Sequence, residues 1–146
     1  MALVSVAQDL LDRTFEIFRE CGGAEFECVV YWTGPRNDAS IIDGLHHPDH
    51  DSNEFGYSVD SDWLSLFLRE IYQQNRSARV QIHTHPGEAF HSITDDGHAL
   101  VPAPGFISIV IPDFAEGQIG LEGAAMYVVS DRGAWARCDV SNVKVY

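Results

Sequence analysis

The stretch from Val80 to Leu100 contains His83, His85, Ser92, Asp95 and Asp96, whose types and spacing suit metal chemistry. The stretch begins as a short apolar strand and carries His83 and His85 in the pattern H-x-H. Because residues i and i+2 of a strand project to the same face, the two imidazoles can approach one ion together. Neutral imidazole suits zinc, copper, iron or nickel, and a catalytic zinc keeps one of its four positions for water.

A carboxylate is the third ligand that a catalytic zinc of this kind needs. Asp95 supplies it, and Asp96 is the fallback. Ser92 or Thr94 can cap a helix that starts here, which would place Ser92 and Asp95 about one turn apart and facing the same way. The stretch therefore predicts a site with two imidazoles, one carboxylate and one hydroxyl.

The order H-x-H-P, a short loop and then S-x-x-D resembles the signature of the JAMM metalloproteases, the zinc-dependent branch of the MPN domain family. In that family two histidines and an aspartate bind zinc, and a serine helps to hold the oxyanion. The resemblance therefore implies one zinc ion held by His83, His85 and Asp95. It also implies that the Ser92 hydroxyl is catalytic.

The family's general base is a glutamate on an earlier strand, seven residues before a glycine that closes the strand. Glu27 has this spacing to Gly34, so the resemblance implies that Glu27 activates the water. Glu25 is the rival base if the register of the strand is shifted. Two features depart from the family pattern: six residues rather than seven separate the second histidine from the serine, and Val30 stands where glycine is commoner.

The resemblance also implies the reaction and the substrate class. JAMM enzymes cleave the isopeptide bond between the C-terminus of a ubiquitin-like protein and a lysine, or trim such a C-terminus to its Gly-Gly form. A compact domain of this kind is similar to the prokaryotic branch, whose members accompany ubiquitin-like proteins and their activating enzymes, some in antiviral defence operons. A ubiquitin-like protein or its conjugate is therefore the expected substrate, and an activating or conjugating system the expected partner.

The elements that must position these residues are predicted from hydrophobic periodicity and turn residues. Helices are expected at residues 5–21 and 62–74, and strands at residues 25–33, 40–45, 55–59, 78–83, 106–111, 124–130 and 134–140. The segment 106–111 is the most apolar and is expected to lie centrally in a sheet. The order predicts an α/β (α+β) sandwich. It also resembles the MPN order, and this resemblance implies a mixed, largely antiparallel sheet sandwiched by helices.

Helix ends are predicted from capping patterns. Ser5 and Gln8 form a capping box for the first helix, which Gly22-Gly23 would end. Asp60 or Ser61 is expected to cap the second helix. That helix carries an apolar stripe that predicts core packing and not a cofactor site: Trp63, Leu64, Phe67, Leu68 and Ile71.

Length and charge set limits on the class of protein. A chain of 146 residues is expected to form one domain, residues 1–146. The net charge is −13, from 22 acids and 9 Lys and Arg, and a field of this sign disfavours nucleic acid. No apolar run reaches the roughly 18 residues of a membrane span. The acidic, amphipathic N-terminus has no basic region typical of a leader, so a cytoplasmic protein is expected.

The remaining candidate ligands are assigned no metal. Cys21, Cys28 and Cys138 are odd in number and form no C-x-x-C pair, so reduced cysteines are expected, with neither a disulfide nor a cysteine–zinc cluster. The histidine-rich tract at residues 46–51 is expected to be a solvated loop, because Pro48 and the alternating acids do not fix a geometry. His91 and His98 are expected to be loop residues and not a fourth ligand.

Two other functions with the same fold stay open. A JAMM amidase that acts on a sulfur-carrier conjugate or on a small-molecule amide would use the same site chemistry. A non-catalytic MPN scaffold would lack the metal ligands. A cupin-like dioxygenase and a zinc deaminase are disfavoured, because the sequence carries neither the second cupin motif nor a P-C-x-x-C pattern.

Overall fold

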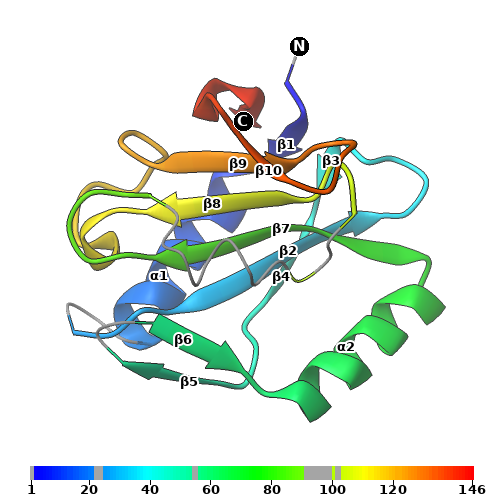
Figure 1. Cartoon of the computed structure of the whole chain (residues 1–146), viewed down its shortest axis with the longest axis horizontal. Coiled ribbons are helices and arrows are strands. Elements are labelled where there is room, and N and C mark those ends of the chain that lie inside the picture. Colours follow the sequence, from blue (N-terminus) through cyan, green and yellow to red (C-terminus); the bar gives the residue numbers. More distant parts are fainter. Residues whose placement is uncertain (1, 22–24, 54–55, 91–99, 101–102) are drawn as a thin grey trace.

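The computed structural model describes residues 2–21, 25–53, 56–90, 100 and 103–146. Its centre is a mixed sheet of six strands in the order β10-β9-β8-β7-β2-β4 (Figure 1). Strands β7 and β8 run parallel, and the other neighbouring pairs of this sheet are antiparallel. The strands are β2 (Val29–Pro35), β4 (Gly44–His46), β7 (Arg76–Thr84), β8 (Ile107–Ile111), β9 (Ala125–Val129) and β10 (Trp135–Cys138).

Strand β8 lies between β7 and β9, and all five of its residues are buried. This confirms the prediction that the apolar segment 106–111 is central. Strands β9 and β10 pair antiparallel in register, with Trp135 opposite Val129, as expected for a hairpin. The strand ends that carry the candidate site therefore belong to the most buried part of the sheet.

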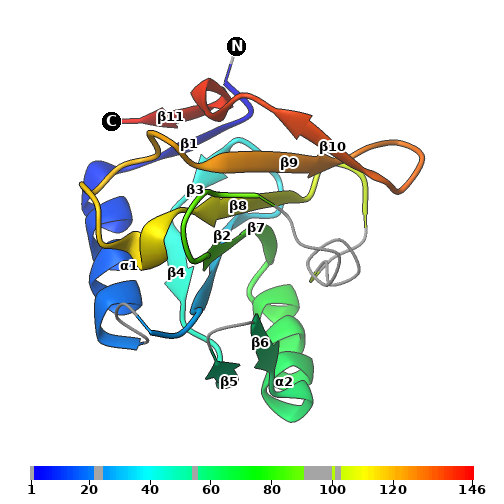
Figure 2. The ribbon, with the colours of Figure 1, turned by 60° about the vertical axis from the view of Figure 1, so that its left-hand side comes forward.

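Helices α1 (Gln8–Cys21) and α2 (Ser61–Gln73) lie on opposite sides of this sheet (Figure 2). Period-two alternation along β2 explains how both can pack on it. Val30 and Trp32 belong to the hydrophobic cluster that contains the buried face of α1. Val29 and Tyr31 point the other way, into the cluster that contains Phe67 and Ile71 of α2. The architecture confirms the predicted sheet sandwiched by helices.

Helix α2 has the cap, the stop residue and the buried face that were predicted from its sequence. Asp60 is the N-cap, and its carboxylate accepts a hydrogen bond from the Trp63 amide at 2.9 Å. Asn75, the predicted stop, has φ +59°, a left-handed conformation that asparagine tolerates better than most residues. The apolar stripe of the helix packs in the core as expected.

The prediction for the first helix is wrong at its start. Helix α1 begins at Gln8, and Ser5 lies in strand β1 (Val4–Val6), so no Ser5–Gln8 capping box begins the helix. Strand β1 is held between β3 (Ile41–Ile42) and β11 (Val143–Val145), both parallel to it. Pairing with segments far away in the sequence overrides the local capping pattern, because it buries Val4 and Val6.

The expected strand at residues 40–45 is divided into β3 and β4. The loop predicted at residues 46–51 is also partly wrong, because His50 begins strand β5 (His50–Asn53). Strand β5 pairs antiparallel with β6 (Gly56–Val59) and forms a separate two-stranded sheet. Short 3-10 helices at Asp113–Ala115 (η1) and Val140–Asn142 (η2) complete the described elements. Within the described ranges, neither α-helix is long and apolar enough to cross a membrane.

Candidate active site

His83 lies near the end of β7, where neighbouring strands hold its backbone on both sides. It pairs with Val29 of β2 and with Val110 of β8, and its side chain is fully buried. Because directly opposite residues of an antiparallel pair share a face, the imidazole points to the same side of the sheet as Val29. The ring of Tyr57, on β6, lies 5.4 Å from the His83 ring, centroid to centroid.

His85 follows just after the end of β7 and is held through its own backbone. Its amide donates to the Ile111 carbonyl at 2.9 Å, and its carbonyl accepts from the Phe114 amide at 3.0 Å. The ring Nδ1 lies 2.8 Å from the Pro86 carbonyl oxygen. Since a carbonyl only accepts, Nδ1 carries the proton and Nε2 keeps its lone pair. This is the tautomer that a metal ligand requires.

Glu27 lies just before β2 and is 4% exposed, whereas Glu25 is exposed. The pairing of β2 with β7 continues past the strand end, because the Cys28 amide donates to Thr84 Oγ1 at 2.8 Å and the Thr84 amide donates to the Cys28 carbonyl at 3.0 Å. One further step of this register sets Glu27 opposite His85. The structure thus favours Glu27 over Glu25 as the carboxylate beside the histidines.

The β5–β6 hairpin borders the same face of the sheet. A Cβ atom added to Gly56 would lie 3.8 Å from the Glu27 carboxylate oxygen Oε2, so the start of β6 passes directly beside that carboxylate. The next residue along β6 is Tyr57, whose ring is against His83. Glu27 and His83 are therefore both covered by the backbone and side chains of one strand.

The remaining predicted site residues, Ser92 and Asp95, lie outside the described residues, as do the fallback Asp96 and the neighbouring His91 and His98. Their roles stay predictions. The pairing of β2 with β7 brings together the segments that carry Glu27, His83 and His85. Two imidazoles two residues apart at the end of β7, one of them with an oriented lone pair, are ligands that suit a divalent metal ion.

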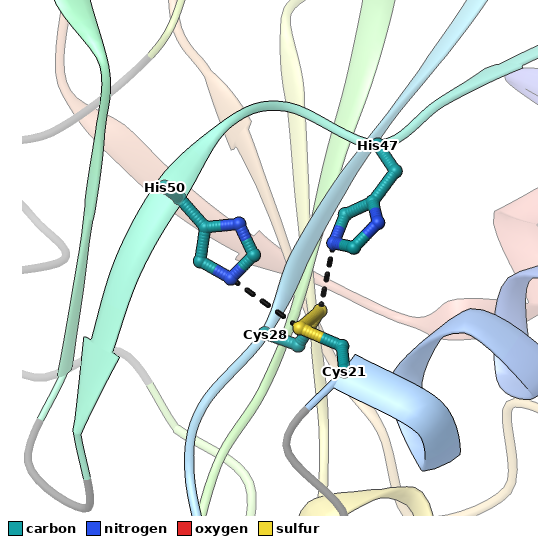
Figure 3. Close-up of side chains that lie close together, drawn as sticks. All are labelled: Cys21, Cys28, His47 and His50. Carbon is teal, nitrogen blue, oxygen red and sulfur yellow. Dashed lines mark hydrogen bonds between the residues drawn. A yellow bond between two sulfur atoms is a disulfide. The ribbon is translucent and has the colours of Figure 1, made fainter.

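A second cluster of side chains that can bind metal lies next to this site, and it was not predicted from the sequence. Cys21, at the end of α1, and Cys28, just before β2, form a disulfide with their Cα atoms 6.2 Å apart. His47 and His50 lie against the two sulfurs, as Figure 3 shows. We call these four residues the Cys–His cluster.

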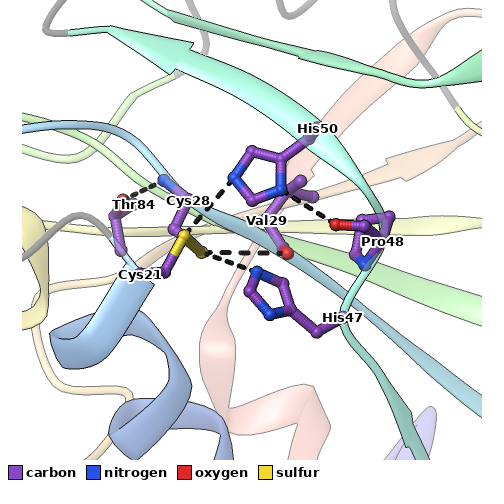
Figure 4. Close-up of a disulfide and its surroundings, with 7 residues drawn as sticks. All are labelled: Cys21, Cys28, Val29, His47, Pro48, His50 and Thr84. Carbon is purple, nitrogen blue, oxygen red and sulfur yellow. Dashed lines mark hydrogen bonds between the residues drawn. A yellow bond between two sulfur atoms is a disulfide. The ribbon is translucent and has the colours of Figure 1, made fainter.

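The Cys–His cluster corrects two predictions: Cys21 and Cys28 are disulfide-bonded rather than reduced, and the histidine tract is not simply solvated. The physical reason is that α1 ends beside the start of β2, while the link between β4 and β5 folds over both (Figure 4). Burial, and next the charge of His50, lowers the pKa of His47, against a smaller opposing effect of Asp49. Cys138 is the free cysteine.

Comparisons with known proteins agree with this geometry. No family model matches the chain. A protein of Sinorhizobium fredii named a probable metalloprotease is 26% identical over 138 residues, which cover 90% of this chain and 85% of the relative.

Two solved structures share the fold. The solution structure of a protein from Desulfitobacterium hafniense matches with a TM-score of 0.70 at 14% identity, over 98% of this chain and 92% of that one. The crystal structure of a JAB1/MPN domain protein from Archaeoglobus fulgidus matches with a TM-score of 0.57 at 12% identity, over 99% and 98% of the two chains. At these identities the two structures show the fold alone.

Proposed function

We propose that the chain is a metalloprotease of the JAMM/MPN type and that it hydrolyses the peptide or isopeptide bond that follows the C-terminal glycine of a ubiquitin-like protein. The observation that carries this proposal is the burial of Glu27 just before β2, where the β2–β7 register, continued past its last pair at Val29 and His83, leads towards His85. Two metal-binding imidazoles with a buried carboxylate beside them are what metal-assisted hydrolysis of an amide needs.

In this proposal His83, His85 and Asp95 hold one zinc ion. When bound, zinc lowers the pKa of a coordinated water from about 15.7 towards about 7 and polarises an amide carbonyl. The chain's own residues set the geometry. The strand spacing directs both imidazoles to one side, and the bond from His85 Nδ1 to the Pro86 carbonyl fixes which nitrogen faces the ion.

The Glu27 carboxylate takes the proton from the attacking water and delivers it to the leaving amine. Its burial under the β6 backbone excludes bulk water from the transfer and keeps the carboxylate near His85. The Ser92 hydroxyl donates to the oxyanion that forms on the carbonyl, and removing such a donor typically costs about 2.7 to 4 kcal/mol of transition-state stabilisation.

Exposed aromatic side chains support an extended protein tail as the substrate. Phe26 precedes Glu27 and is 42% exposed, and Phe90 is 47% exposed with its ring 4.5 Å from that of His85. Large exposed apolar side chains beside a site are typical of a surface that binds a partner. An extended tail along a strand edge would lead its glycines past the Phe90 ring to the metal.

The test compares the wild type, Glu27→Gln and His83→Ala/His85→Ala. Each is purified with its disulfide intact, so that the sulfurs of the Cys–His cluster take no metal. The wild type and Glu27→Gln are expected to bind one equivalent of zinc by elemental analysis, and the double histidine variant none. The wild type is expected to cleave a ubiquitin-like protein joined through its Gly-Gly terminus to a lysine peptide, and Glu27→Gln to be at least about 100-fold slower, the lower end of what general base catalysis contributes.

Each of the other outcomes would favour a different function for this chain. A folded wild type that takes up no zinc would contradict the metalloprotease proposal and favour the scaffold. Zinc binding without cleavage of the Gly-Gly conjugate, but with Glu27-dependent hydrolysis of a sulfur-carrier conjugate or a small amide, would favour the amidase.

A further inference from the structure

The Cys–His cluster has the ligand set of a second metal site. Each sulfur faces one imidazole nitrogen: Cys21 Sγ lies 3.3 Å from His50 Nε2, and Cys28 Sγ lies 3.4 Å from His47 Nε2. All four of these ligand atoms lie within 4.8 Å of one another (Figure 3). They come from three different parts of the chain, so folding alone brings them together.

The separations suit a tetrahedral ion. With Zn–S bonds of about 2.3 Å and Zn–N bonds of about 2.0 to 2.1 Å, the edges of a tetrahedron measure roughly 3.4 to 3.8 Å. The two sulfur–nitrogen distances already lie near this range. Two thiolates and two imidazoles are a common ligand set of structural zinc, which is closed to water.

The surroundings also orient the ligands. His50 Nδ1 lies 2.9 Å from the Pro48 carbonyl oxygen, so Nδ1 donates and Nε2 turns its lone pair towards Cys21 (Figure 4). Metal-binding histidines almost always donate their other ring N–H in this way. Cys28 is fully buried, which protects the position from solvent on its inner side.

We propose that, once Cys21 and Cys28 are reduced, the Cys–His cluster binds one zinc ion as a structural site separate from the pair His83 and His85. The disulfide and the zinc site are then two alternative cross-links between the same two segments. Both fix the end of α1 to the start of β2, next to Glu27. Only the zinc site would also bind His47 and His50. Because His50 begins β5, zinc would then hold the start of the β5–β6 hairpin, which covers Glu27 and His83.

The chemistry balances in two steps. A phosphine or dithiol reductant supplies two electrons, breaks the S–S bond and leaves two thiols, and the reductant itself becomes the phosphine oxide or a disulfide. Binding of Zn²⁺ then forms two Zn–S bonds and releases the two thiol protons. In the reverse direction a small-molecule disulfide takes two electrons from the thiolates and two protons from water and becomes two thiols, while the S–S bond forms again and the ion is released.

Cobalt(II) is the probe that tests this site, because only sulfur ligands give a thiolate-to-cobalt charge-transfer band in the near ultraviolet. The described residues of the candidate active site and the predicted Asp95 contain no sulfur. The wild type is reduced with a phosphine, loaded with cobalt, and compared with Cys21→Ser/Cys28→Ser and with His47→Gln/His50→Gln. Cys138→Ser and His46→Gln are the matched controls, since each changes a neighbouring residue type outside the cluster.

The reduced wild type and both controls are expected to show the band together with the visible bands of tetrahedral cobalt. The double cysteine variant is expected to lose the near-ultraviolet band, and the double histidine variant to show that band only at higher cobalt concentration, since the visible bands also report cobalt bound at His83 and His85. Absence of a thiolate band in the reduced, folded wild type overturns the proposal, as does a band that survives Cys21→Ser/Cys28→Ser.

A second measurement needs no variant and so covers the case in which the substitutions prevent folding. The reduced wild type is alkylated with and without zinc, and modified cysteines are identified by mass spectrometry. Cys21 is partly exposed, so it is expected to be alkylated without zinc and protected with it, whereas Cys138 is alkylated in both samples. Equal alkylation of Cys21 with and without zinc overturns the proposal. Neither readout depends on hydrolysis, so the outcome is independent of the proposed function.

Discussion

Thr84 lies between the candidate active site and the Cys–His cluster. Its hydroxyl oxygen accepts the hydrogen bond from the Cys28 amide at 2.8 Å, and both groups are buried. This bond joins the end of β7, which carries the two histidines, to the segment that carries Glu27 and Cys28. Together with the bond from the Thr84 amide to the Cys28 carbonyl, it holds the segment of Glu27 beside the segment of the two histidines.

The variant Thr84→Val is expected to lower the free energy of unfolding by about 1 to 3 kcal/mol, because the buried Cys28 amide loses its acceptor while the volume of the side chain is kept. We also expect a lower kcat, since Glu27 is one residue away from the released amide. Urea unfolding and the Gly-Gly conjugate assay measure the two effects. Thr84→Ser keeps the hydroxyl and is the control, and equal stability of the valine and serine variants would contradict the role of this bond.

At the scale of single residues, the H-x-H spacing predicted that His83 and His85 project to one side, because that relation is local. The sequence predicted Glu27 only through its resemblance to the family signature, in which a glutamate stands seven residues before a glycine. It did not predict the Cys–His cluster, whose members His47 and His50 reach the sulfurs only after the β4–β5 connection folds over α1. Two signals were available: the spacing of Cys21 and Cys28 between a helix and a strand, and the histidine-rich tract at residues 46–51.

Gly34 sets how closely two elements approach. It lies on β2, seven residues after Glu27, and a Cβ atom built on it would lie 1.9 Å from the Ile41 carbonyl oxygen of β3. Because the obstructing atom is backbone, it cannot turn away. Glycine is therefore required here by the packing of β3 and not by the conformation of the turn.

The variant Gly34→Ala is expected to be less stable by about 1 to 3 kcal/mol, the usual cost of forcing extra volume into a well-packed region. Gly117→Ala is the matched control, because an added Cβ at Gly117 meets nothing within 4 Å. Thermal unfolding of both variants measures the difference. If Gly117→Ala is destabilised as much as Gly34→Ala, the close approach of β3 is not the cause.

Elements that carry a capping residue or an apolar pattern of their own were predicted well. Strands that form only by pairing with segments far away in the sequence were not. Helix α2 has both a capping aspartate and an apolar stripe, and β8 is a continuous apolar run. Strands β1 and β11 are three residues each and exist because they pair with each other, about 140 positions apart. No local pattern encodes such a pair, so the capping signal of Ser5 was misleading.

At the scale of the whole molecule, several of the few cationic side chains serve as donors inside the structure. Arg19 donates to the carbonyls of Ala115 and Gly117, and Arg79 to those of Pro35 and Arg36. Arg76 pairs with Asp43. With 22 acids against 9 Lys and Arg, these contacts leave a surface field dominated by carboxylates, which favours a basic partner surface over a phosphate backbone.

The stability of the whole chain at alkaline pH provides a last prediction. Tyr31 is 3% exposed and packs between the sheet and α2, with its ring 5.8 Å from that of Phe67. Burial raises the pKa of its phenol well above the ordinary value of 10.0. A group whose pKa is higher in the folded state contributes stability that is complete below its unfolded pKa and is lost as the pH rises towards the folded value.

The free energy of unfolding should therefore fall as the pH rises above about 10, because the unfolded chain ionises Tyr31 and the folded chain does not. Urea unfolding at pH 8 and at about pH 10.5 measures the fall. Tyr31→Phe removes the titrating group and keeps the ring, so its fall should be smaller than that of the wild type. Tyr72→Phe, at a position 69% exposed, is the control and should behave like the wild type. An equal fall in Tyr31→Phe and Tyr72→Phe would show that the packing of α2 on the sheet does not hold this phenol neutral.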